Sequence, residues 1–302
     1  MPDEQGNMVE SLSQFIECFK SIYPSKDEIV VYRGHSKADY ELKPGLFREG
    51  KEELRINEDK IVRDIEAARP MSFVNDRTTL DKLVTMQHYG LPTRLLDVTS
   101  NPLVALYFAV KSEPQKNGVV LKLNLLHGAN KFFDSDTVTS LANLAYLNQY
   151  EKEELKRLVD SKMKYLRRVG AYIKIPYDER EHKIESKTKQ EGKDDYMIIH
   201  KKFNQIKDQN EKNINETINQ KFLQMQNAEC EKEFNKQPVL EHFLHFIRAD
   251  KPYFQPQIRP RDLYKVLHVK VKQHNARIVA QGGSFLIFGL KDKSFEHFSN
   301  VS

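Results

Sequence analysis

Short strand-like runs lie at both ends of this 302-residue chain, and a long charged stretch separates them. The runs are residues 28–34, 118–125, 264–271 and 277–290. In the last of them, Gly282 and Gly283 predict a bulge or a break between two strands. Strands from the two ends must pair with each other to bury their apolar faces. We therefore predict an α+β fold with one main domain and a central, mostly antiparallel sheet closed by the C-terminal strands.

Helical periodicity predicts the elements that flank this sheet. The predicted helices cover residues 8–23, 50–68, 79–88, 102–110, 137–169 and 239–249. The helix at 102–110 is rich in large apolar residues, so we expect it to be mostly buried. Thr99, Ser100 or Asn101 would provide its N-cap, with Pro102 in the first turn.

The charged stretch, residues 177–236, is rich in lysine, glutamate and asparagine and poor in large apolar residues. This composition favours solvated helices and loops. We therefore predict an N-terminal helical segment at 1–27, the first part of the core at 28–176, a charged helical insertion at 177–236, and a C-terminal helix and strands of the core at 237–302.

Charge and motifs exclude several classes of protein. The net charge is +5, from 48 interspersed basic and 43 acidic residues, which is typical of a solvated surface rather than a groove that follows phosphates. No apolar run reaches the ~20 residues of a membrane span, and no signal peptide is evident, so we expect a cytoplasmic protein without a membrane partner. Its oligomeric state stays open.

Known metal-binding and nucleotide-binding motifs are also missing from the sequence. Cys18 and Cys230 are far apart, and neither a paired CxxC nor an HExxH pattern occurs, so we predict no metal site. Walker and Rossmann glycine patterns do not occur either, which argues against an ATPase or a dehydrogenase. A metal-dependent nuclease is disfavoured because no compact set of carboxylates is visible.

The first polar cluster, Tyr32-Arg33-Gly34-His35, ends a predicted strand. An arginine at a strand end can bind phosphate or carboxylate through two parallel hydrogen bonds, and a glycine beside it lets a ligand approach the backbone. The alternative is a structural ion pair between Arg33 and Asp97. The four residues alone leave both interpretations open.

The second cluster lies just before the predicted helix at 102–110. Its polar residues are Gln87, His88, Tyr89, Thr93, Arg94, Asp97, Thr99 and Ser100. The free N–H groups of a helix N-terminus can bind phosphate or ribose oxygens. Alternatively, Asp97, Thr99 and Ser100 cap the helix and Arg94 pairs with Asp97, although a cap uses only one such group. A histidine such as His88, taken alone, is more often a hydrogen-bonded structural residue than a base.

The third cluster combines Arg277 with Gln281-Gly282-Gly283-Ser284. Paired glycines within a strand pattern indicate a bulge or a close approach of a ligand. The side-chain amide of Gln281 is then a candidate partner for a sugar hydroxyl.

Together these segments resemble the FRG-domain family, which is named for a Phe/Tyr-Arg-Gly motif. The matching segments are VYRGHS, LKPGLFR, MQHYGLPTRLLDVTSNPLVALYFA, HFIRADKPYFQP and RIVAQGGSFLIFG, which span residues 29–290. One position departs from the family pattern, because Val98 stands where the family usually has tryptophan.

The order of the clusters is also similar to ADP-ribosyltransferase folds, in which a first strand carries the arginine, a central segment carries Ser or Thr, and a late strand carries Glu or Gln. This resemblance implies NAD as the substrate and catalytic roles for Arg33, Ser100 and Gln281. It also implies a binding set: Tyr32, Gly34, His35, His88, Tyr89, Thr93, Arg94, Asp97, Thr99 and Arg277. A glutamine supports a developing cation less well than the glutamate of most transferases.

Two functions follow as hypotheses. The first is an ADP-ribosyltransferase or NAD glycohydrolase that binds NAD or a related nucleotide, as a toxin or effector in bacterial anti-phage defence. The second is a non-catalytic sensor that binds a phosphorylated small molecule, a nucleic acid or a phage protein. In the second case the insertion at 177–236 would contact the partner.

Overall fold

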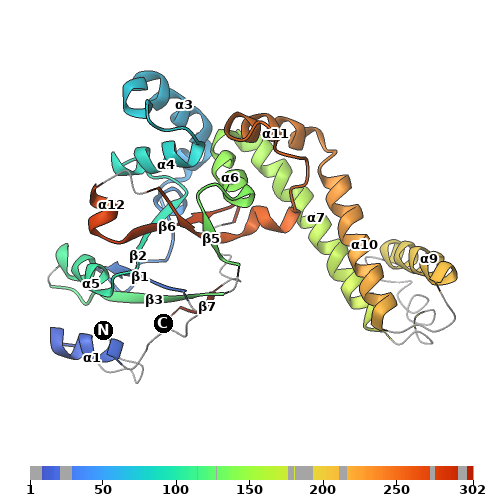
Figure 1. Cartoon of the computed structure of the whole chain (residues 1–302), viewed down its shortest axis with the longest axis horizontal. Helices are drawn as coiled ribbons and strands as arrows, with labels where there is room; N and C mark the ends of the chain where they lie inside the picture. Colours follow the sequence, from blue (N-terminus) through green and yellow to red (C-terminus); the bar gives the residue numbers. More distant parts are fainter. Residues whose placement is uncertain are drawn as a thin grey trace. The chain divides into compact units, whose positions relative to one another are not determined.

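The computed structural model describes residues 9–20, 29–113, 115–126, 128–175, 180, 193–210, 216–272, 276–291 and 298–301. The chain forms two compact units. Figure 1 colours the chain by residue number, from blue at the N-terminus to red at the C-terminus. The α/β unit comprises Met1–Gln149, Phe246–Phe254 and Asp262–Ser302, and the helical unit comprises Tyr150–His245 and Gln255–Arg261. The predicted domain boundaries at residues 27, 176 and 236 stay predictions.

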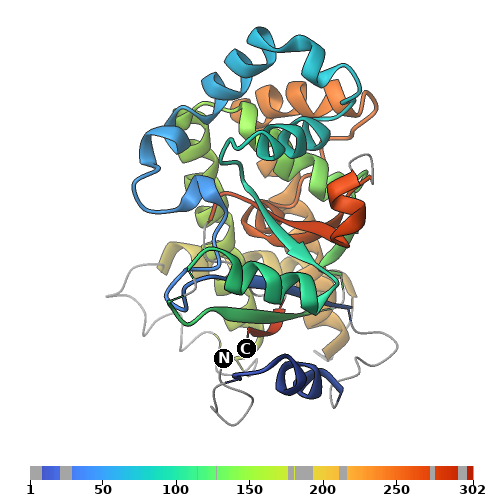
Figure 2. The same cartoon turned by 90° about the vertical axis from the view of Figure 1, so that its left-hand side faces the viewer.

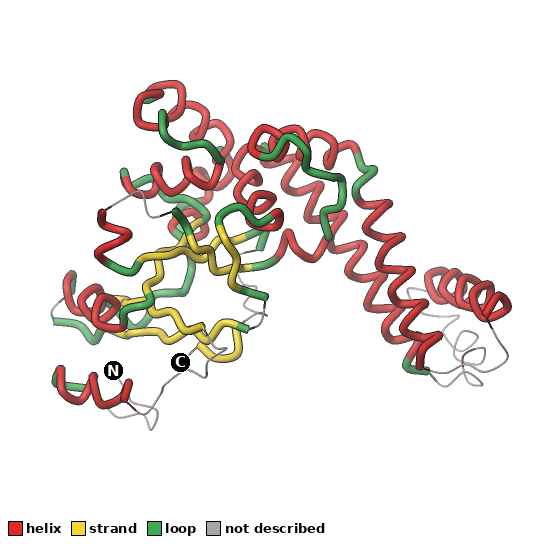
Figure 3. The backbone as a smooth tube through the Cα atoms, viewed as in Figure 1, coloured by secondary structure: helices red, strands yellow, loops and turns green. Residues whose placement is uncertain are grey.

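The α/β unit is built on a seven-stranded sheet with the order β4-β5-β6-β2-β1-β3-β7. Figure 3 draws the strands in yellow. Its strands are β1 (Ile29–His35), β2 (Leu95–Thr99), β3 (Val119–Leu125), β4 (Asn130–Phe132), β5 (Val266–Lys270), β6 (Gly283–Phe288) and β7 (Phe298–Val301). Only β4 and β5 pair in parallel among the described strands. The predicted α+β class and mostly antiparallel sheet are confirmed, and C-terminal strands do pair with early ones.

The sequence patterns missed one strand and predicted one helix as a strand. Strand β2 was not predicted, because polar residues interrupt its apolar pattern even though four of its five residues are buried. The first part of the run at 277–290 is a short helix, α12 (Ala276–Ala280), rather than a strand. Gly282, at φ +54°, donates its N–H to the carbonyl of Val279 and ends this helix before β6 begins.

Strands β1 and β2 pair at a single position, which is the middle of β1 and the last residue of β2. They pair at Tyr32 and Thr99, and no further register position is paired among the described residues. By contrast, β1 pairs with β3 over its full length, from Ile29 to His35, and β2 pairs with β6 from Leu95 to Thr99. Beyond Tyr32 and Thr99 the two strands therefore diverge, and the sheet opens between them (Figure 2).

Helix α5 (Pro102–Lys111) packs closely against β1 (Figure 1). A Cβ atom on Gly34 would lie 1.8 Å from the carbonyl oxygen of Ala105, so this position accepts only glycine. The helix thus turns its small residues to the sheet and leaves its large apolar ones outside: Leu103, Tyr107 and Val110 are 47–57% exposed. The expectation of a mostly buried helix was wrong for this reason. Asn101 provides the N-cap and accepts from the Leu103 N–H.

Other helices of this unit surround the sheet. They are α1 (Leu12–Lys20), α2 (Glu52–Ile56), α3 (Glu58–Ala68), α4 (Thr79–His88) and α6 (Asp136–Asn143), with the 3-10 helices η1 (Gly45–Phe47), η2 (Pro70–Phe73) and η3 (Leu144–Tyr146). Phe15 of α1 joins Ala105 and Ala109 of α5 in a core over Tyr32. A second core contains Val31, Leu96 and Phe288.

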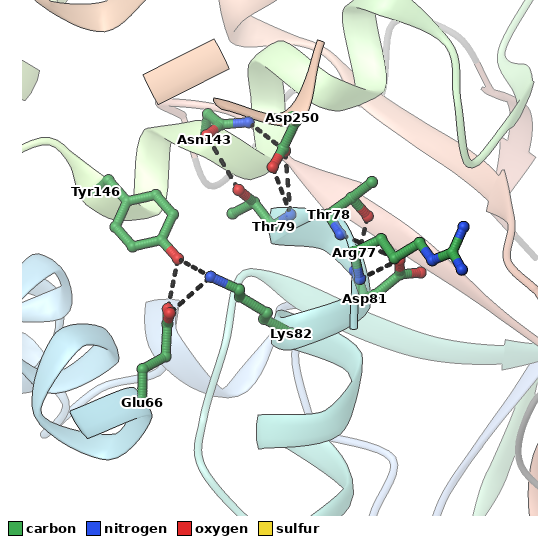
Figure 4. A network of polar contacts seen from close by, with 9 residues as sticks. All are labelled: Glu66, Arg77, Thr78, Thr79, Asp81, Lys82, Asn143, Tyr146 and Asp250. Carbon is green, nitrogen blue, oxygen red and sulfur yellow. Dashed lines mark hydrogen bonds and ion pairs between the residues drawn. The ribbon is translucent and has the colours of Figure 1, made fainter. Parts of the chain in front are cut away.

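A partly buried polar network fixes the N-terminus of α4 (Figure 4). Both carboxylate oxygens of Asp250 accept from the Thr79 N–H at 3.0 Å, and Asn143 donates to the same carboxylate at 2.8 Å. At the next turn, Lys82 donates to Glu66 at 2.6 Å and to the Tyr146 hydroxyl at 3.2 Å. A carboxylate complements the positive end of a helix dipole, so this network sets the position of α4 in the unit.

A buried ion pair joins the first residue of α3 to the residue just before β2. Arg94 is 2% exposed and binds Glu58 through Nε at 3.0 Å and Nη2 at 2.5 Å. Its Nη1 donates to the carbonyl of Phe288 at 3.0 Å. The alternative of a pair between Arg94 and Asp97 therefore does not form, and Arg94 is part of the packed interior.

The helical unit consists mainly of α7 (Gln149–Ile173), α9 (Lys193–Asn210), α10 (Glu216–Phe234) and most of α11 (Pro238–Asp250). A 3-10 helix, η6 (Pro260–Tyr264), follows in the chain. The core of the helical unit includes Tyr172, Phe203 and Phe222, so the described part of the predicted charged segment is helical and packed. None of the described helices is long and apolar enough to span a membrane.

Removing one partner of the buried pair should destabilise the α/β unit. Arg94→Met leaves the Glu58 carboxylate buried without its cation, and we expect a loss of about 3–5 kcal/mol in the free energy of unfolding. Urea denaturation followed by circular dichroism measures this loss. The double variant Glu58→Leu/Arg94→Met is the control and should recover much of it, whereas equal stability of both variants would contradict the assignment.

Candidate functional site

A cavity of about 330 Å³ opens where β1 and β2 diverge. Residues from β1, β2, α4, α5, α12 and β6, together with the segment after β1, line it, and all of them belong to the α/β unit. This volume lies in the range of small-molecule sites. We refer to this cavity as the cleft.

Arg33 crosses the opening between the strands. Its Nη1 donates to the main-chain carbonyl of Asp97 at 2.5 Å, and its Nε donates to Nε2 of His35 at 3.0 Å. The partner in β2 is thus a carbonyl that lacks a ladder bond, and within the described part of the chain no carboxylate lies within ion-pair distance of Arg33. The expected alternative, a structural ion pair with Asp97, is not what forms.

Burial lowers the pKa of Arg33 to about 10, an effect that the nearby Asp97 carboxylate opposes and Arg48 reinforces. The guanidinium therefore stays charged at neutral pH. A charged group in a partly buried cleft without a carboxylate at contact distance is suited to an anionic ligand.

His35 holds Arg33 in place as a neutral acceptor. It is 3% exposed, and burial together with Arg33 and Arg48 lowers its pKa to about 4. Because Nε2 accepts from Arg33, the neutral ring carries its proton on Nδ1. His35 therefore orients the arginine without adding charge to the cleft.

Arg48 supplies a second guanidinium to the cleft and was missed as a site residue. It follows η1 and donates from Nε to the carbonyl of Lys43 at 3.3 Å. Its position in LKPGLFR, a segment that resembles the FRG family, was the available signal. Two guanidiniums, Arg33 and Arg48, thus face the same space.

Asp97 is held by a chain of polar side chains that starts at Thr93. The Thr93 hydroxyl donates to Oε1 of Gln87, and Nε2 of Gln87 donates to Oδ2 of Asp97 at 2.8 Å. The Thr93 hydroxyl also accepts from the Leu95 N–H at 3.2 Å. Thr93 itself does not line the cleft, and it acts through Gln87.

Thr99 and Ser100 brace the turn that brings Gln281 to the cleft. The Thr99 hydroxyl donates to the carbonyl of Gln281 at 2.6 Å, and the Ser100 N–H donates to the carbonyl of Gly282 at 3.1 Å. The Ser100 hydroxyl contacts that same carbonyl at 3.4 Å. Gln281 lines the cleft, but Ser100 does not, so the structure gives Ser100 a bracing contact instead of the expected place in the site.

The structure brings together most of the predicted site residues. Those that line the cleft are Tyr32, Arg33, Gly34, His35, His88, Asp97, Thr99 and Gln281. Those that do not line it are Tyr89, Thr93, Arg94 and Ser100. Tyr89 is 74% exposed. The side chain of Arg277 lies outside the described residues. The binding roles of these residues stay predictions.

Gly34 has a structural reason for being glycine, because α5 occupies the space of its Cβ. Another residue that sequence reasoning missed is His268, which supports the cleft residue Ser284 through a hydrogen bond of 2.8 Å. Burial and Lys270 lower the pKa of His268 to about 4. Within the described residues, no three His, Cys, Asp or Glu side chains converge as a metal-binding group.

The two buried histidines should make the α/β unit sensitive to acid. For His35 the folded-state pKa of about 4 lies below the ordinary 6.5, so its contribution to stability is present above pH 6.5 and is lost as the pH falls toward 4. The loss should be on the order of 2–3 kcal/mol. In His35→Gln, urea unfolding between pH 7.5 and 4.5 should lose about half of the acid sensitivity, because His268 remains; an unchanged pH dependence would refute this.

Comparison with known proteins identifies the part of the chain that carries most of the cleft. The family model described as FRG domain matches residues 28–118, which include β1, β2, α4 and α5. No curated protein and no solved structure matches the chain. The matched range contains Arg33, His35, Arg48 and Asp97, whereas Gln281 lies beyond it. Residues 28–118 are therefore identified as an FRG domain, and this matched range provides all of the cleft lining except the wall from α12 and β6.

Proposed function

We propose that the cleft binds a phosphate-bearing nucleotide, with NAD as the leading candidate, and that the protein is an ADP-ribosyltransferase or NAD glycohydrolase. The observation that carries this proposal is the pair of guanidiniums, Arg33 and Arg48, that line one cavity of about 330 Å³. Arginine forks match phosphate oxygens in geometry and charge. The predicted cytoplasmic location belongs to the same proposal.

The other walls of the cleft suit the remaining parts of such a ligand. Val104, Phe108 and Ile278 provide apolar surface for a flat ring, and the Gln281 amide provides hydrogen bonds for ribose hydroxyls. One carboxylate, Asp97, offsets part of the positive charge. The cleft thus combines anion binding, ring packing and hydroxyl recognition, which together describe a nucleotide.

Binding of ADP-ribose to the full chain tests the phosphate role of the arginines. Titration calorimetry should detect binding by the wild type, and Arg33→Ala and Arg48→Ala should each weaken it about 10- to 100-fold, because a hydrogen bond to a charged group contributes about 1.5–3 kcal/mol. Arg69→Ala, at an exposed arginine that does not line the cleft, is the control and should bind like the wild type. Equal binding by all four proteins would contradict the proposal.

Incubation with NAD tests the enzymatic part. We expect the purified wild type to release nicotinamide, measured by chromatography, and Arg33→Ala to release at least tenfold less. Nucleotide binding without nicotinamide release would reject the enzyme and favour the alternative, a non-catalytic ligand sensor. For a toxin or anti-phage effector, induced expression in bacteria should arrest growth, and Arg33→Ala should relieve the arrest.

A further inference from the structure

We propose that the carboxylate of Asp97, rather than the side chain of Gln281 or Ser100, is the catalytic group of the cleft. This inference rests on the proposed function and assigns the group that would act on the scissile glycosidic bond of NAD.

Asp97 is the only carboxylate among the described residues that line the cleft. It lies in the middle of β2, where the residues on either side are buried and Asp97 alone is exposed. Aspartate is disfavoured in strands, and β2 is an inner strand of the sheet between β1 and β6. Its exposure follows from the divergence of β1, which leaves the cleft in front of it.

The carboxylate of Asp97 is held in one orientation. The Thr93 hydroxyl fixes the Gln87 amide so that its NH₂ group faces Oδ2 of Asp97, and Arg33 fixes the Asp97 main chain through its carbonyl. Oδ1 accepts no hydrogen bond from the residues that the structure describes. One oxygen is thus anchored by supporting residues and the other is open to the cleft, as a reacting group requires.

The rival residues are less suited to the reaction. Gln281 presents a neutral amide, which gives little electrostatic support to a developing cation. The Ser100 hydroxyl contacts the carbonyl of Gly282 and does not line the cleft.

The proposed step is hydrolysis of the bond between ribose C1′ and nicotinamide nitrogen. The oxygen of a water molecule forms a bond to C1′ as the C1′–N bond breaks. The electron pair of the broken C1′–N bond stays on the nitrogen of the neutral nicotinamide that leaves. The Asp97 carboxylate stabilises the cationic sugar and accepts the proton of the water, which then passes to solvent. The products are ADP-ribose, nicotinamide and one proton, so atoms and charge balance. Thr93 is a positioning residue that acts through Gln87.

Rates of nicotinamide release and affinities for ADP-ribose, measured on the same full-length variants, test this role. Asp97→Asn should lower the release rate at least 100-fold, as expected for a general base, and change the ADP-ribose affinity less than threefold. Asp64→Asn, at an exposed aspartate of α3 outside the cleft, is the matched control and should react like the wild type. Thr93→Val should lower the rate without weakening binding, and Thr93→Ser should restore it.

The outcomes separate the two proposals. If the wild type releases no nicotinamide, the proposed function fails, and the role of Asp97 fails with it. If the wild type reacts and Asp97→Asn keeps its rate, only the role of Asp97 is overturned. If Asp97→Asn does not fold, as judged by its thermal midpoint, the Thr93 pair decides: equal rates for Thr93→Val and Thr93→Ser would reject the oriented carboxylate.

Discussion

The divergence of β1 from β2 is the constraint on which the site depends. The two strands share one paired position, Tyr32 with Thr99, and their other edges are occupied by β3 and β6. Past that position, main-chain groups need partners other than a ladder, and Arg33 supplies one by donating to the carbonyl of Asp97. The opening is therefore stabilised by the same arginine that offers its charge to a ligand.

Packing on β1 maintains this opening. Gly34 admits the backbone of α5 at a distance that no side chain would permit, and Ala105 and Ala109 of the helix pack over Tyr32 of the sheet. On the other side of the cleft, α4 carries Gln87 and is fixed at its N-terminus by Asp250. The cleft thus lies between two helices whose positions depend on buried contacts.

Arg33 and Arg94 differ in the charge of the groups that they bind. Arg94 has a buried carboxylate partner, Glu58, and serves the interior, whereas Arg33 has a neutral histidine and a carbonyl as partners and keeps its charge available. A ligand with an anionic group can therefore gain from Arg33 what it cannot gain from Arg94. Arg48 adds to this charge at the edge of the same cavity.

Sequence periodicity by itself determined the α+β class, the strands β1 and β3 and the position of Arg33 in a strand that leads into a motif. The resemblance to the FRG family also related Gln281 to Arg33 across the chain. Only the tertiary structure decided that Arg94 is buried, that Ser100 braces a turn and that Asp97 faces the cleft. The physical reason is that these roles depend on partners distant in sequence: Glu58 lies 36 residues from Arg94, and Gly282 lies 182 residues from Ser100.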